Sequence, residues 1–149
     1  MQPPADVIQA AKAAEKRWGI PASIQLAQWA VESGWGKHMP PGSNNPFGMK
    51  ARHSVTPPDP SVTVRTREQD VHGHDYWIEV EFRVFKDVAS AFDAHGQLLC
   101  QPVYAKARKC LPNADAFANA LTGVYATDRG YGKALIAVMR GSNLYGYDA

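Results

Sequence analysis

The spacing of apolar residues changes along this chain, and the change limits the folds that it can adopt. Apolar residues recur at helical spacing in residues 4–18 and again from Pro21 to about Ser33. Between Ser61 and Phe85 the period becomes two, and a polar turn at residues 70–75 divides this stretch into two alternating runs. Helical spacing returns after Asp87, a residue type that often caps helices. The pattern predicts one β-hairpin inserted into a helical chain.

Three further helical segments are predicted at residues 102–109, 113–122 and 130–139, so most of the chain is helical. The predicted architecture is a single α+β domain over residues 1–149, with the β-lobe at about residues 61–86. A glutamate-bearing helix followed by such a lobe is the layout of lysozyme-like enzymes, although a shared fold does not fix a shared function.

The composition is that of an ordinary globular domain. Of the 149 residues, 45% are apolar, and the net charge of +2 is far below that of a strongly basic nucleic-acid-binding domain. No apolar run reaches the ~18 residues of a membrane span. The first residues have neither the basic nor the apolar region of a Sec signal peptide. We therefore expect no nucleic acid as a partner, no membrane span and no Sec signal.

Few residues suggest a metal site or a disulfide. Cys100 and Cys110 are the two cysteines, and the sequence leaves open whether they pair. His72, His74 and Asp75 place ligand-type side chains in one turn, without a further ligand at a recognisable spacing. We expect neither a metal nor a cofactor, and we expect a monomer.

Glu32 is the most suggestive single residue for function. It is the only ionisable side chain between Arg17 and Lys37, and tryptophans stand close to it in the sequence. A carboxyl among apolar groups is harder to ionise than one in water, and a protonated carboxyl is what a general acid needs. The alternative is that Gln25, Gln28 and Glu32 form one polar stripe that faces solvent.

Four segments of the chain resemble glycoside hydrolase family 73, in the same order. They are Gln28–Lys37 (QWAVESGWGK), Asn45–Lys50 (NPFGMK), Thr66–Glu68 followed by Phe82–Phe85 (TRE and FRVF), and Tyr125–Leu135 (YATDRGYGKAL). The corresponding family segments are AQAALESGWGK, NLFGIK, T-x-E followed by F-R-x-Y/F, and Y-A-T-D-P-x-Y-x-x-K-L. Pro46 and Arg129 depart from these patterns, but neither replaces a reacting group. The family includes bacterial peptidoglycan N-acetylglucosaminidases and the wall-cutting domain of the flagellar rod protein.

The resemblance implies catalytic roles for three residues. Glu32 matches the general acid of the family, and Glu68 matches the second glutamate, on the β-lobe. Glu79 and Glu81 are rival carboxylates for the second role, and Glu68 is favoured over them. The alternative for each of the three glutamates is a solvated strand residue. Tyr125 matches a tyrosine that the family keeps near the acid, whereas Tyr131 is expected to be a packing residue and Asp128 to form the turn into the last helix.

Substrate contacts are predicted for residues that suit sugar rings. Trp35 and Phe47 could stack on the apolar face of a sugar, and Asn45 could hydrogen-bond an acetamido group. Packing in the core is the alternative for the two aromatic residues.

The resemblance predicts a peptidoglycan hydrolase that cleaves a β-1,4 bond between N-acetylglucosamine and N-acetylmuramic acid. The alternatives are a lytic transglycosylase, which leaves anhydro-sugar ends, and a catalytically silent wall-binding module. The expected partner is the peptidoglycan glycan strand, in the periplasm or outside the cell. Without a Sec signal, the expected routes to the wall are phage lysis, a specialised secretion system and the flagellar apparatus.

Overall fold

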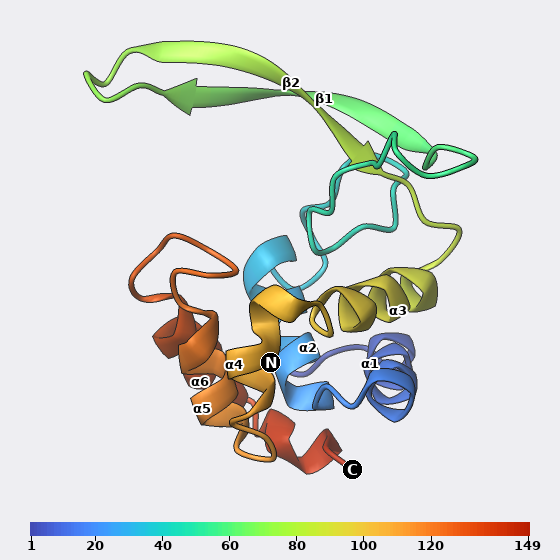
Figure 1. Ribbon diagram of the computed structural model, residues 1–149, viewed down its shortest axis with the longest axis vertical. Coiled ribbons are helices and arrows are strands. Elements are labelled where there is room, and N and C mark those ends of the chain that lie inside the picture. The colour runs from blue at the N-terminus through green and yellow to red at the C-terminus, as the bar shows by residue number, and fades with distance from the viewer.

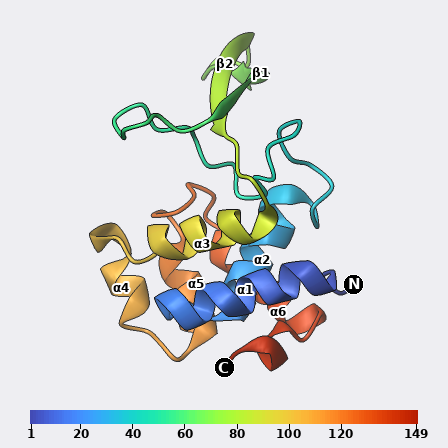
Figure 2. The same cartoon turned by 90° about the vertical axis from the view of Figure 1, so that its right-hand side faces the viewer.

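Helix α2 (Ala22–Ser33) lies at the centre of the helical body in the computed structural model, which describes residues 1–149 (Figures 1 and 2). It packs against helices on several sides, and every one of its residues is buried except Val31 and Glu32. The predicted solvent-facing stripe is therefore wrong for Gln25 and Gln28, whose side chains are fully buried. The helix ends at Gly34, which adopts the left-handed conformation at φ 56° that glycine tolerates best.

The other elements surround α2 or project from the body (Figure 1). In chain order the elements are α1 (Ala5–Trp18), α2, β1 (Ser61–Gln69), β2 (Asp75–Arg83), α3 (Val88–Leu98), η1 (Pro102–Tyr104), α4 (Ala105–Arg108), α5 (Ala114–Leu121), α6 (Tyr131–Gly141) and η2 (Leu144–Tyr147). The α+β, lysozyme-like architecture predicted from the sequence is confirmed. None of the helices has the length and apolar character needed to cross a bilayer. Both cysteines are free thiols.

Strands β1 and β2 form one antiparallel hairpin that stands away from the helices (Figures 1 and 2). The second strand begins two residues earlier than the aromatic run Trp77–Phe85 suggested, because Asp75 pairs with Gln69 across the turn. The register pairs Val62 with Phe82 and Glu68 with Tyr76, so these residues share one face of the hairpin. Along β1 this face is the more protected one.

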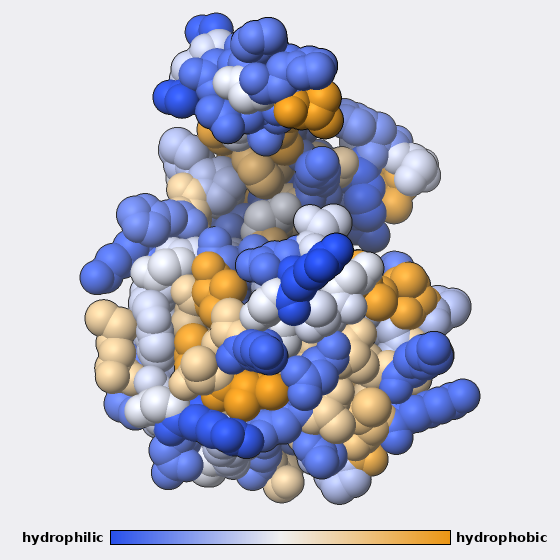
Figure 3. Space-filling model, turned by 90° about the vertical axis from the view of Figure 1, so that its left-hand side faces the viewer, coloured by the Kyte–Doolittle hydropathy of each residue, from blue (hydrophilic) through white to orange (hydrophobic).

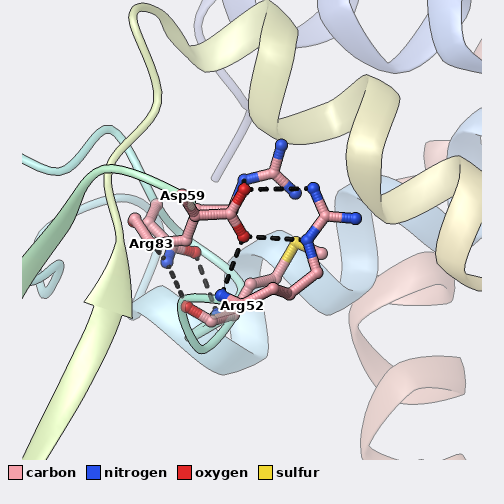
Figure 4. Close-up of polar contacts among 5 residues, drawn as sticks. Arg52, Asp59 and Arg83 are labelled. Carbon is pink, nitrogen blue, oxygen red and sulfur yellow. Dashed lines mark hydrogen bonds and ion pairs between the residues drawn. The ribbon is translucent and has the colours of Figure 1, made fainter. Parts of the chain in front are cut away.

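Asp59 ties the hairpin to the loop that precedes it (Figure 4). Its carboxylate accepts hydrogen bonds from Nε and Nη2 of Arg52, at 2.8 and 3.1 Å, and from the Arg52 backbone N–H at 2.9 Å. The Nε of Arg83, at the end of β2, lies 3.6 Å from the same carboxylate. The hydrogen bonds from Arg52 hold the pKa of Asp59 below its usual range, so the carboxylate stays ionised.

Helices α5 and α6 lie close together at Gly132. A methyl group at this position would lie 2.8 Å from the backbone oxygen of Ala118 and 2.8 Å from Cα of Asn119. The backbone N–H of Gly132 also donates to Oγ1 of Thr122 at 3.0 Å. Because residue 132 is a glycine, α6 can pack directly against α5. This packing fixes the position of Tyr131, the residue before the glycine.

The close approach predicts that Gly132→Ala destabilises the protein by about 1–3 kcal/mol, since backbone atoms of α5 have to move. Gly141→Ala, in the same helix, is the matched control because no atom lies within 4 Å of the place that its new methyl group would take. We expect Gly141→Ala to be neutral or slightly stabilising. Urea unfolding of the two variants measures the difference; equal stabilities would contradict this account of α6.

Candidate active site

Glu32 stands at the surface end of the buried helix α2. Its side chain is exposed, whereas Gln28, Trp29 and Ser33, which lie within about one helical turn of it, are buried. This corrects the expectation that nearby tryptophans enclose the carboxyl, because Trp29 is buried and packs edge-on against Trp35 instead, with ring centroids 5.6 Å apart. A ligand placed over Glu32 would supply the cover that the protein alone does not.

Tyr131, the first residue of α6, holds the carboxyl of Glu32. Its hydroxyl donates to Oε1 of Glu32 at 2.8 Å and accepts a hydrogen bond from Nε2 of the buried Gln28 at 3.0 Å. Burial, chiefly, raises the pKa of Tyr131 above its ordinary value of 10.0, so the phenol remains a donor across the physiological pH range. No protein group donates to the other carboxyl oxygen, Oε2, which is left free for a ligand or a proton.

The hydrogen bonds that link Gln28, Tyr131 and Glu32 differ from what the sequence predicted for Tyr131. Tyr131 was expected only to pack, but its hydroxyl contacts Glu32 directly. Its position relative to Glu32 depends on how α6 docks on α2, and local sequence does not report this. The one available signal was the spacing of Gln28 and Glu32 by one helical turn, which places both side chains on the same side of α2.

A cavity of about 320 Å³ lies beside Glu32 and brings two predicted site residues next to it. Its walls come from α2, the loop after α2, the end of α3, η1 and the turn before α6. The lining residues are Glu32, Phe47, Gly48, Met49, Leu98, Tyr104, Tyr125 and Ala126. Most of this lining is apolar or aromatic, which suits the apolar faces of sugar rings. Figure 3 shows a hollow between the hairpin and the helical body on one side of the molecule.

Tyr125 lies in this cavity and stacks on the tyrosine that holds Glu32. The rings of Tyr125 and Tyr131 are nearly parallel, with centroids 5.6 Å apart. Burial, followed by the nearby charge of Glu32, raises the pKa of the Tyr125 phenol, which therefore stays neutral. Its hydroxyl makes no hydrogen bond within the protein, so it is available to a ligand.

Phe47 forms part of the cavity wall although it is mostly buried. Its ring stacks on the fully buried His95, with centroids 3.9 Å apart. Neither ring nitrogen of His95 has a hydrogen-bond partner, and burial lowers the pKa of His95 to about 3, so the imidazole is neutral. The stack fixes Phe47 in place behind the cavity.

Asn45 has a structural position rather than the substrate-facing one that the sequence suggested. It is 1% exposed, and its Nδ2 donates to the backbone oxygens of Met49 and Arg83 at 2.8 and 2.9 Å. Its Oδ1 accepts from the backbone N–H of Met49 at 3.1 Å. Because both amide hydrogens are used, the geometry favours a role in shaping the loop that carries Phe47. It offers no donor to an acetamido group.

Trp35 is half-buried and does not line the cavity beside Glu32. Its backbone adopts φ 61°, which is uncommon for a residue with a large side chain. Its backbone N–H donates to the oxygen of Ala30 at 3.0 Å, so the turn that ends α2 sets this conformation.

Glu68 lies apart from the cavity, one residue from the end of β1 at the hairpin turn. It is exposed, and Oγ1 of Thr66 is its hydrogen-bond partner at 3.4 Å. Glu79 and Glu81 pair with Arg65 and Thr63, so they lie on the opposite hairpin face from Glu68. In addition, Nε2 of His53 lies 2.6 Å from Oε2 of Glu81.

The remaining predictions concern turns and metals. Asp128 shapes the turn into α6, because its Oδ1 accepts from the backbone N–H of Gly130 at 2.8 Å. No three His, Cys, Asp or Glu side chains gather in a metal-binding arrangement.

Known proteins resemble this chain in both sequence and fold. The family model described as mannosyl-glycoprotein endo-beta-N-acetylglucosaminidase matches residues 8–144. Peptidoglycan hydrolase FlgJ of Salmonella typhimurium is 32% identical over 137 residues, which are 87% of this chain and 42% of that protein. A probable N-acetylmuramidase of Lactococcus lactis subsp. lactis is 30% identical over 139 residues, which are 87% of this chain and 30% of that protein.

The solved glycoside hydrolase domain of Salmonella typhimurium FlgJ, in a C-terminally truncated form, has the same fold. It matches with a TM-score of 0.74 at 31% identity, covering 92% of this chain and 93% of that domain. This chain spans about two-fifths of the full-length FlgJ relative, so it corresponds to the hydrolase portion of that protein. The chain belongs to the glucosaminidase family, glycoside hydrolase family 73.

Proposed function

We propose that this chain hydrolyses a β-1,4 glycosidic bond between N-acetylglucosamine and N-acetylmuramic acid in peptidoglycan. The observation that carries the proposal is the position of Glu32, a surface carboxyl held by Tyr131 at the edge of an aromatic cavity. Two relatives with the same domain are called a peptidoglycan hydrolase and a probable N-acetylmuramidase. The site of action would be the bacterial cell wall, in the periplasm or outside the cell.

Glu32 is proposed as the general acid that protonates the departing glycosidic oxygen. Tyr131 donates to Oε1, so the carboxyl group is oriented while Oε2 is free to carry the transferred proton. A glycan seated in the cavity would cover the exposed carboxyl and exclude water from it. Tyr125 directs its unpartnered hydroxyl at the substrate. Phe47 contacts a sugar ring through the small part of its surface that lines the cavity, and Trp35 is proposed to contact the glycan outside this cavity.

Glu68 is proposed as the second carboxylate, which activates the attacking water. It lies on the hairpin face that also carries Val62 and Phe82, opposite to Glu79 and Glu81. Since Glu68 does not line the cavity in the free protein, the role requires the hairpin to approach a bound glycan. Assistance by the acetamido group of the substrate is the alternative, and it would leave Glu32 as the sole essential carboxyl.

Two other functions predict different products. A lytic transglycosylase would use Glu32 but leave anhydro-sugar ends, whereas a silent wall-binding module would retain the cavity without turnover.

We propose that the protein acts as a monomer and reaches the wall through phage lysis, a specialised secretion system or the flagellar apparatus.

Glu32→Gln tests the general acid. We expect wall lysis to fall by about 100- to 10,000-fold, because glutamine cannot supply the proton. The side chain is exposed at the end of α2, so circular dichroism and the midpoint of thermal unfolding should stay close to those of the parent protein. Retention of full lytic activity by a folded Glu32→Gln protein would rule out the assignment.

Glu68→Gln tests the second carboxylate against a control on the same hairpin. We expect Glu68→Gln to slow release of reducing ends from purified walls by about 100-fold or more, whereas Glu79→Gln, on the other face, should retain activity. Both glutamates are exposed, so neither change should affect folding. Full activity of Glu68→Gln would instead support the acetamido-assisted route.

Tyr131→Phe and Tyr125→Phe separate a positioning tyrosine from one that contacts substrate. The first variant leaves the buried Nε2 of Gln28 without its partner, so we expect a loss of about 1–3 kcal/mol in stability together with slower turnover. The second removes a hydroxyl with no partner in the protein, so turnover should fall while stability is unchanged. Chemical denaturation beside a wall-digestion assay measures both effects; a stable Tyr131→Phe protein with full activity would contradict the positioning role.

A further inference from the structure

Arg83 carries a guanidinium group that the protein leaves largely without partners. Its side chain is 22% exposed, and it donates no hydrogen bond, although it lies 3.6 Å from Asp59 and 4.6 Å from the centre of the Phe85 ring. A guanidinium has five N–H donors in a fixed plane, and leaving such donors unused in a partly buried position is costly. The position is therefore suited to an acceptor supplied from outside the chain.

A cavity of about 240 Å³ is lined by Arg52 and Arg83 on one side and by helix α3 on the other. Figure 4 shows the guanidinium groups of Arg52 and Arg83 side by side next to the Asp59 carboxylate. Lys50 contributes a third cation to the lining, and α3 with the segment after it contributes two amides, Gln97 and Gln101. No carboxylate lines this cavity, so Asp59 offsets one of three positive charges and the cavity is cationic.

This cationic cavity adjoins the cavity of Glu32. Met49 and Leu98 line both of them, so a ligand that passes over these two side chains reaches from Glu32 to Arg83. The buried amide of Asn45 accepts from the backbone N–H of Met49 and donates to the backbone oxygen of Arg83, so it holds these two cavity-lining residues together. The distance along the chain, from Glu32 to Arg83, gives no hint of this proximity.

We propose that the cationic cavity binds a carboxylate of the peptide that branches from muramic acid, while the glycan occupies the cavity of Glu32. The inference rests on the proposed function, since it assigns a further part of the same substrate to the neighbouring site. Planar guanidinium groups match the geometry of a carboxylate, and the amides of Gln97 and Gln101 can exchange hydrogen bonds with a peptide backbone. A neutral glycan would gain nothing from three cations.

Gln97→Glu tests the proposal without disturbing the contact between Arg52 and Asp59. Gln97 is exposed on α3, and the substitution places a negative charge of nearly the same shape in the cavity. Gln9→Glu is the matched control because it adds the same charge at an exposed position of α1 that lines none of the cavities. The control separates a local effect from general repulsion by the anionic wall.

Rates are compared on intact peptidoglycan and on glycan from which an amidase has removed the peptides. We expect Gln97→Glu to slow cleavage of intact peptidoglycan by about three- to tenfold, which is the size of effect expected for a partly screened, charge-assisted contact. Cleavage of stripped glycan should change by less than about twofold. Gln9→Glu should change neither rate by more than about twofold. Amidase treatment frees the lactyl carboxylate, which intact peptidoglycan holds as an amide. An equal loss on both substrates would therefore mean that the cavity reads the glycan or this freed group rather than the peptide, and would overturn the proposal. No loss on either substrate would overturn it as well.

A binding measurement keeps the inference separate from turnover. Side-chain Nε–H signals of Arg52 and Arg83 can be followed by NMR while the soluble stem peptide is added, with the same peptide amidated at its carboxyl groups as the control. We expect the Arg83 signal to shift with the first peptide only, and equal or absent shifts would refute carboxylate binding. If the parent protein cut neither glycan, the proposed hydrolase function would fail, whereas this titration would still decide whether the cavity binds the peptide.

Discussion

The hydrogen bond from Tyr131 to Glu32 connects the two parts of the fold on which the site depends. Helix α2 carries the carboxyl to the surface, and α6 brings the hydroxyl that orients it at 2.8 Å. The buried Gln28 donates to the same hydroxyl, so the direction of both hydrogen bonds is fixed. Gly132 makes this arrangement possible, because only a residue without a side chain lets α6 lie so close to α5. The reacting group is exposed, but its support is part of the core.

The hairpin forms a second wall opposite the helical body, with the hollow of Figure 3 between them. Asp59 holds the loop before the hairpin to Arg52 and attracts Arg83 at the end of β2, so the base of the hairpin is anchored while its turn projects away from the body (Figures 1 and 4). The turn end carries Glu68, and the base adjoins the cationic cavity. A polymer that leaves the cavity of Glu32 over Met49 and Leu98 passes the base of the hairpin, whereas contact with Glu68 requires the turn end to move toward it.

Helix and strand positions followed from the sequence because local residues determine them. Gly19 and Gly34 end α1 and α2 in the left-handed conformation, and Asp87 caps α3 by accepting from the backbone N–H of Ser90. The tertiary partners of polar side chains did not follow. Tyr131 lies 99 residues from Glu32 in sequence, and Asn45 saturates its amide with backbone groups that no local pattern places beside it. Glu68 was identified by its motif alone, and its distance from the cavity depends on how far the hairpin projects.

The most direct test of the central claim is mass spectrometry of the fragments released from purified peptidoglycan in water enriched in oxygen-18. Protonation by Glu32 followed by attack of water predicts one labelled reducing end for each bond cut, and the sugar at that end identifies the bond. Hydrolysis with Glu32 as the general acid predicts labelled, reducible N-acetylamino-sugar ends that disappear in the Glu32→Gln protein. Unlabelled anhydro-sugar ends, or release of fragments that persists in the folded Glu32→Gln protein, would contradict it.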